Sequence, residues 1–79
     1  MKILVVDDSA FARQRIGKVL KDAGHEVFET ENGEGALRLA EEIRPQVVTV
    51  DLLMPGMNGI EVVRRLKKQR PDLRIVVVS

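Results

Sequence analysis

The sequence predicts an α/β fold in which an open parallel sheet is built by the alternation β-α-β-α-β-α-β. Two observations predict this class. Short runs of β-branched apolar residues recur along the chain, and stretches with helical periodicity lie between them. Because most of these runs are apolar on both faces, they suit strands that are covered on both sides, as is typical of parallel sheets.

Four short segments are expected to form the strands. Three of them are almost wholly apolar, whereas the second is more polar, which favours a position at the edge of the sheet. The four segments are residues 3–6, 26–30, 47–50 and 75–78. Since parallel strands in one sheet are joined by right-handed crossovers, the segments between them must lie over the faces of the sheet.

Three helices are expected between the strands. The first lies between Ser9, which can cap its start, and Gly24, which can end it in a left-handed conformation. The second runs from about Gly33–Ile43 and the third from about Gly59–Gln69, with Asn58 as its N-cap, and a proline follows each of them. The apolar residues of the first helix share one helical face, made of Ala12, Ile16, Val19, Leu20 and Ala23.

Composition indicates an ordinary globular protein. Lys and Arg number 13 against 12 acidic residues, and the resulting net charge of +1 gives no electrostatic reason to expect nucleic-acid or membrane binding. The chain has no cysteine, which excludes disulfides and Cys-ligated metal sites. With 79 residues and an N-terminal apolar run of only four, we expect one domain over residues 1–79, located in the cytoplasm.

Acidic residues follow two of the expected strands. Asp7 and Asp8 follow the first strand, and Asp51 follows the third. Parallel strands end at one edge of a sheet, so these carboxylates converge if the two strands are neighbours, about 4.8 Å apart. Such an all-oxygen cluster suits a hard divalent ion, Mg²⁺ in particular. Any one of them alone could equally be a turn former or a helix cap, but three together favour a functional site.

The segment after Asp51 is a short strand-to-helix loop. Pro-Gly and Asn-Gly pairs in it are turn signals. Backbone amides of this loop, first those of Leu52 and Leu53, could face an anion near Asp51, although a loop that only connects two elements is the alternative. The loop reads Leu52-Leu53-Met54-Pro55-Gly56-Met57-Asn58-Gly59.

These motifs are similar to those of bacterial response-regulator receiver domains, and the likeness runs along the whole chain. It implies a flavodoxin-like fold with strand order 2-1-3-4. The chain would then be a receiver truncated after its fourth strand, without the fifth strand, the lysine that follows it and the last two helices. The likeness rests on Val5-Val6-Asp7-Asp8-Ser9, on Asn32-Gly33 with Ala36-Leu37, on Val50-Asp51 and its loop, and on Ile75-Val76-Val77-Val78-Ser79.

The resemblance also implies a role for each site residue. Asp51 would be the phospho-acceptor, phosphorylated by a sensor histidine kinase. Asp8 and Asp51 would bind Mg²⁺ directly, together with the backbone carbonyl of Leu53, and Asp7 would act through a bound water molecule. The hydroxyl of Ser79 would bind the phosphoryl group and report its presence.

We therefore expect a phospho-accepting module of two-component signal transduction, which is no enzyme beyond catalysing its own phosphorylation and dephosphorylation. The implied strand order leaves one face of the third and fourth strands bare, so we also expect a homodimer or a strand-exchanged oligomer. The alternative is a truncated or engineered fragment that self-associates as a structural unit without phosphotransfer. A flavin or nucleotide binder is disfavoured, because the loops are acidic where phosphate would lie.

Overall fold

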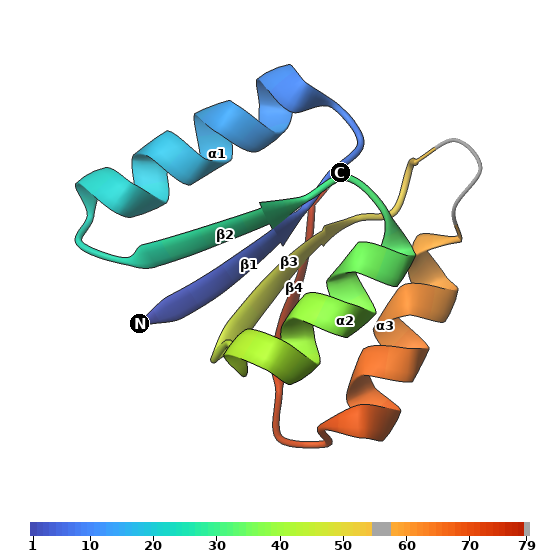
Figure 1. Cartoon of the computed structure of the whole chain (residues 1–79). Helices are drawn as coiled ribbons and strands as arrows, with labels where there is room; N and C mark the ends of the chain where they lie inside the picture. The colour runs from blue at the N-terminus through green and yellow to red at the C-terminus, as the bar shows by residue number, and fades with distance from the viewer. Residues whose placement is uncertain (55–57, 79) are drawn as a thin grey trace.

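The computed structural model describes residues 1–54 and 58–78, and the alternation of strands and helices along them is the expected one (Figure 1). The expected strand bounds differ from the observed ones by no more than one residue. The expected Pro55-Gly56 turn, Met57 and Ser79 lie outside the described residues. The strands are β1 (Lys2–Val6), β2 (Glu26–Thr30), β3 (Val47–Asp51) and β4 (Arg74–Val78), and the helices are α1 (Ala10–Asp22), α2 (Gly33–Ile43) and α3 (Gly59–Gln69).

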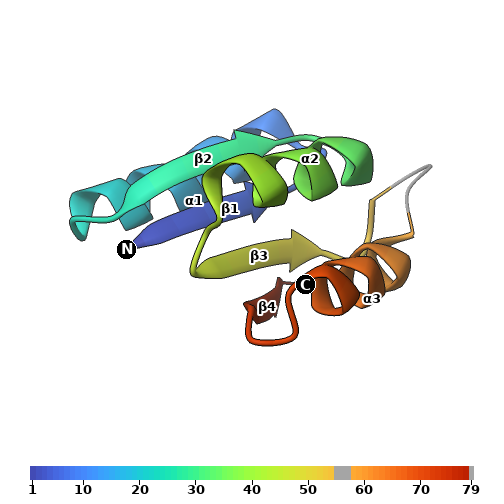
Figure 2. The same cartoon turned by 60° about the horizontal axis from the view of Figure 1, so that its bottom comes forward.

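The strands form one parallel sheet in the order β2-β1-β3-β4, which confirms the expected strand order (Figures 1 and 2). In the centre, Ile3 of β1 lies opposite Val27 of β2 on one side and Val47 of β3 on the other. At the end of β3, Asp51 lies opposite Val78 of β4. The more polar strand β2 lies at an edge, as its sequence predicts, and β1 and β3 are direct neighbours.

The helices are divided unequally between the two faces of the sheet (Figure 2). Helices α2 and α3 pack side by side on one face, where α2 contacts β1 and β2 and α3 contacts β3. Helix α1 packs on the other face, against β1 and β2. No helix in the part of the chain that the structure describes is long and apolar enough to cross a membrane.

The hydrophobic core lies between the sheet and the pair α2 and α3. Alternate residues of β1 and β3 point into it, and the two helices contribute their apolar faces. This packing fixes the two central strands and therefore the positions of their carboxyl ends. The cluster comprises Leu4, Val6, Ala36, Ala40, Val48, Val50, Met54, Val62, Leu66 and Leu73.

The α1 face is packed less completely. Gly17 is the only buried residue of α1, and Val19 is 67% exposed. The expected apolar face of this helix exists, but much of it faces open space rather than the core. On the same side of the sheet, Thr49 is half-buried and its partner Val76 on β4 is 49% exposed. A groove of about 470 Å³ along α1 is lined by Phe11, Ala12, Arg15, Ile16, Val19 and Leu20.

Polar side chains cap all three helices at the ends that lie beside the carboxyl edge of the sheet. Ser9, Asn32 and Asn58 each accept hydrogen bonds from backbone amides in the first turn of their helix. At the opposite ends, Gly24 (φ 93°) has the expected left-handed conformation, and Arg44 (φ 50°) shares it without being glycine. The caps order the short loops between each strand end and the helix that follows.

Candidate metal centre

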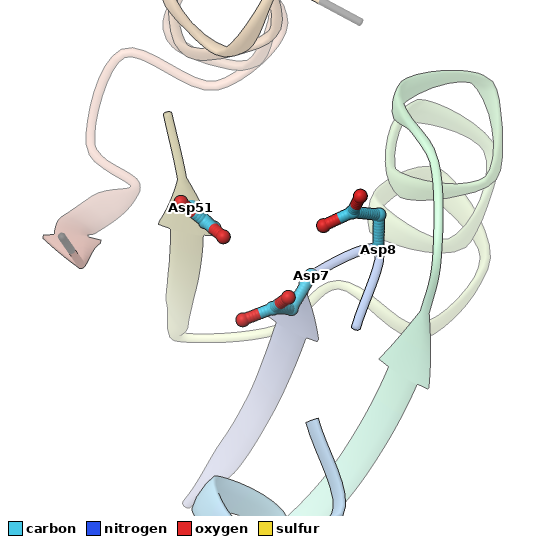
Figure 3. Close-up of side chains that lie close together, drawn as sticks. All are labelled: Asp7, Asp8 and Asp51. Carbon is cyan, nitrogen blue, oxygen red and sulfur yellow. The ribbon is translucent and has the colours of Figure 1, made fainter. Parts of the chain in front are cut away.

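Three aspartates meet at the carboxyl edge of the sheet (Figure 3). Asp7 and Asp8 directly follow β1, and Asp51 is the last residue of β3. One carboxylate oxygen of each residue lies within 4.8 Å of those of the other two. The structure therefore brings together the three acidic residues that the sequence predicts to converge.

The three carboxylates differ in their exposure to solvent. Asp7 is buried, with 4% of its surface exposed, whereas Asp51 is half-buried and Asp8 is exposed. A buried carboxylate needs hydrogen bonds to offset its desolvation, and Oδ1 of Asp7 accepts one from the amide of Ser9 at 2.9 Å. Negative charges at these separations repel one another, and a cation among them offsets that repulsion. The carboxylate donor set, open to water on the side of Asp8, fits a hard divalent ion.

The loop after β3 orients Asp51. Its Oδ1 accepts a hydrogen bond from the backbone amide of Leu53 at 2.9 Å, so this amide faces the Asp51 carboxylate itself. The side chain of Leu53 is 74% exposed, and the loop thus contributes to the site through its backbone. Met54 anchors the loop, because its side chain is buried in the core cluster. Gly59 allows α3 to begin close to the end of β3, since a Cβ at this position would lie 2.8 Å from Cα of Leu52.

Arg13 of α1 contacts the site through the backbone of the loop that follows β1. Its Nη1 donates a hydrogen bond to the backbone oxygen of Asp7 at 2.7 Å. The motifs in the sequence do not point to Arg13, because a basic residue in an amphipathic helix usually belongs to a solvated face. The sequence feature that could identify Arg13 is its spacing of four residues from Gly17. This spacing places both residues on the side of α1 that faces β2.

Comparisons with known proteins identify the family. Residues 3–79 match the sequence profile of the response regulator receiver domain. The chemotaxis protein CheY of Thermotoga maritima is 39% identical over 79 residues, which cover 99% of this chain and 66% of that protein. The response regulator GacA of Pseudomonas aeruginosa is 42% identical over 81 residues, and this chain covers 38% of it. The chain thus spans about two thirds of the first relative's length and a smaller share of the second.

Solved structures share the fold. The chemotaxis protein CheY4 of Vibrio cholerae superposes with a TM-score of 0.90 at 37% identity, over 96% of this chain and 65% of that one. NtrX of Brucella abortus gives a TM-score of 0.94 at 32% identity, over 99% of this chain and 18% of that one. The sequence profile, the identities and the 2-1-3-4 sheet agree, and the chain belongs to the response regulator receiver domain family.

Proposed function

We propose that this chain is the phospho-accepting module of a two-component signalling system, in which Asp51 takes the phosphoryl group. The supporting observation is the convergence of Asp7, Asp8 and Asp51 within 4.8 Å in a chain of the receiver family. The cluster lies at the carboxyl edge of the sheet, which is where open α/β folds bind their ligands. The donor would be a sensor histidine kinase in the cytoplasm, and the proposal includes no nucleic-acid or membrane partner.

The donor set at this edge fits Mg²⁺. Carboxylate oxygens are the ligands that this ion prefers, and it usually keeps several water molecules, for which the exposed side of the cluster leaves room. In the proposal, Asp8 and Asp51 bind the ion directly with the backbone carbonyl of Leu53, and Asp7 acts through a water molecule. When bound, Mg²⁺ supplies positive charge that offsets the charge on the phosphoryl oxygens.

In the reaction, a carboxylate oxygen of Asp51 bonds to phosphorus while the bond between phosphorus and the histidine nitrogen of the kinase breaks. The nitrogen keeps the electron pair, and the product is an acyl phosphate. The Leu53 amide, 2.9 Å from Oδ1, holds the carboxylate in one orientation. The backbone of Leu52 and Leu53 would face the transferred oxygens, and the hydroxyl of Ser79 would bind one of them. Catalysis by the chain is limited to its own phosphorylation and dephosphorylation.

The test combines Mg²⁺ binding with chemical phosphorylation. Mg²⁺ should raise the thermal midpoint of the unaltered chain, because an ion that binds only the folded state stabilises it, and it should not raise that of Asp8→Asn. A small acyl phosphodonor with Mg²⁺ should add one labile phosphoryl group, seen by mass spectrometry, and Asp51→Asn should remain unlabelled. Asp72→Asn is the matched control, because its exposed carboxylate lies just before β4, at the opposite edge of the sheet. If the unaltered chain neither responds to Mg²⁺ nor becomes labelled, the proposal is wrong.

We also propose that the chain forms a homodimer or a strand-exchanged oligomer through β4. Val76 and Val77, which point to opposite faces of this strand, are 49% and 50% exposed. Within the described residues, β4 pairs with β3 alone, so its other edge can accept a further strand. Sedimentation at micromolar concentration should show a dimer that dissociates on dilution, and a monomer at every concentration would contradict this proposal. Stable oligomers without phosphorylation would favour the alternative function, a self-associating structural unit.

A further inference from the structure

The pair Arg13 and Glu29 joins α1 and β2 to the loop that follows β1. Nη1 of Arg13 donates to the backbone oxygen of Asp7 at 2.7 Å, and its Nε lies 3.5 Å from Oε1 of Glu29. The side chains of the pair are only 16% and 27% exposed, whereas those of Lys18 and Asp22, a pair on the same helix, are 78% and 67% exposed. Shielding of this kind makes the Arg13 contacts less open to competition from water.

Further contacts hold Glu29 in place over α1. A Cβ at Gly17 would lie 2.8 Å from Oε2 of Glu29, so the absence of a side chain there makes room for the carboxylate. Nζ of Lys21 lies 4.0 Å from the same oxygen. The amide of Asp7 donates to the backbone oxygen of Thr30 on β2 at 3.2 Å. The backbone of Asp7 is therefore fixed at its amide by β2 and at its carbonyl by Arg13.

We propose that Arg13, held by Glu29, is a positioning residue of the acidic site. Its guanidinium fixes the peptide group between Asp7 and Asp8, and with it the directions of both carboxylates. Arginine suits this role because its donors form a rigid planar fork that reaches a carbonyl and a carboxylate together. The inference rests on the proposed function, since the carboxylates are positioned to bind Mg²⁺.

When Arg13 is altered, the loss of its charge and the loss of its hydrogen bond have opposite expected effects on the affinity for Mg²⁺. Removal of a cation beside three carboxylates leaves the site more negative, which by itself strengthens Mg²⁺ binding. Loss of the hydrogen bond to the Asp7 carbonyl loosens the ligands and weakens binding. Lysine keeps the charge but lacks the planar fork, so Arg13→Lys tests position alone.

The experiment is a calorimetric titration of the whole chain with Mg²⁺ alone. Arg13→Lys should raise the dissociation constant about tenfold, the lower end of the effect of altering groups that orient metal ligands. Arg15→Lys is the matched control: it makes the same change on an exposed part of α1, where Arg15 lies 5.5 Å from the centre of the Phe11 ring. It should leave the dissociation constant within about twofold, as for a group remote from the ligands. Without metal, the amide of Asp7, which donates to the backbone oxygen of Thr30, should exchange hydrogen faster in Arg13→Lys than in the control.

Each outcome decides between positioning and a purely structural role. A lower thermal midpoint of Arg13→Lys with an unchanged dissociation constant would overturn the inference. If that variant does not fold, Glu29→Gln takes its place and should raise the dissociation constant about threefold, since the arginine remains but loses its anchor; no change would overturn the inference as well. If the unaltered chain does not bind Mg²⁺, the proposed function fails instead, and hydrogen exchange at the amide of Asp7 still tests the role of Arg13.

Discussion

The two faces of the sheet differ in how completely helices cover them. On the face of α2 and α3, Leu4, Val48 and Leu66 have no exposed surface. On the face of α1, Val5 of β1 is equally buried, but Val19 of α1 is two thirds exposed and Val76 of β4 is half exposed. Burial stabilises a fold by about 25 cal/mol for each Å² of apolar surface removed from water. The core cluster lies on the first face, which therefore contributes the larger share of the hydrophobic stabilisation.

The acidic site draws on both faces in different ways. The core on the α2 and α3 face holds β1 and β3 side by side, and so sets the distance between their ends. The α1 face buries fewer residues, chiefly Ile3 and Val5 of β1, but it provides the contacts of Arg13 with the Asp7 carbonyl and with Glu29. The comparison suggests that stability and the fine orientation of the site can be altered separately, and three predictions test this.

The largest effect is expected from Leu66→Ala, at the centre of the better-covered face. Leu66 is fully buried, and removal of a buried leucine side chain to alanine costs about 2–5 kcal/mol. That is a large part of the total stability of a domain of this size, commonly 5–15 kcal/mol at about 25 °C. Urea denaturation of both chains measures the difference. Val19→Ala on α1 is the control and should cost no more than about 0.5 kcal/mol; equal losses would mean that the two faces contribute alike.

The second prediction compares two glycines, one in a helix on each face of the sheet. Gly59→Ala should destabilise the fold by about 1–3 kcal/mol, because the new Cβ would meet backbone, the Cα of Leu52, at 2.8 Å. Gly17→Ala meets only the end of the flexible Glu29 side chain, and alanine favours a helix over glycine by up to about 1 kcal/mol.

Gly17→Ala should therefore raise the free energy of unfolding slightly. Because it displaces Glu29, it should also weaken Mg²⁺ binding, so that stability and affinity change in opposite directions. Denaturation and calorimetry on the same samples measure both quantities. Equal destabilisation by the two glycine variants would show that α1 is packed as tightly as the start of α3.

The smallest effect is expected from Val76→Thr on the open part of the sheet. Val76 is already 49% exposed, and threonine keeps the β-branched shape, so the free energy of unfolding should change by less than about 0.5 kcal/mol. The same substitution at the fully buried Val48 places a hydroxyl in the core and should cost about 1–3 kcal/mol. Light scattering should show weaker self-association of Val76→Thr, and unaltered association would exclude this face from the contact.

Local patterns in the sequence predict most of the fold. Apolar runs locate the strands to within one residue, and the caps Ser9 and Asn58 locate two helix starts, because these signals depend on neighbours along the chain. The convergence of the three aspartates follows from the parallel sheet once β1 and β3 are adjacent. That adjacency depends on contacts between residues far apart in sequence, and the resemblance to the receiver family predicts it.

Other features depend on three-dimensional contacts that no spacing encodes. The left-handed Arg44 is one, since its position before Pro45 indicates where the helix ends but not the conformation in which it ends. The contact between Arg13 and the Asp7 carbonyl is another, because it depends on the direction of a long side chain. Periodicity likewise shows that apolar residues of α1 share a face, but not what covers that face.

The parallel direction of the strands has a practical consequence for handling the protein. Every strand ends at the acidic edge, so Met1 lies at the opposite edge (Figure 1). The five residues of β1 separate Met1 from the end of this strand by about 17 Å, at roughly 3.3 Å per residue. An affinity tag, a fluorescent reporter or a surface linker joined at Met1 would thus leave the aspartates open to the proposed kinase.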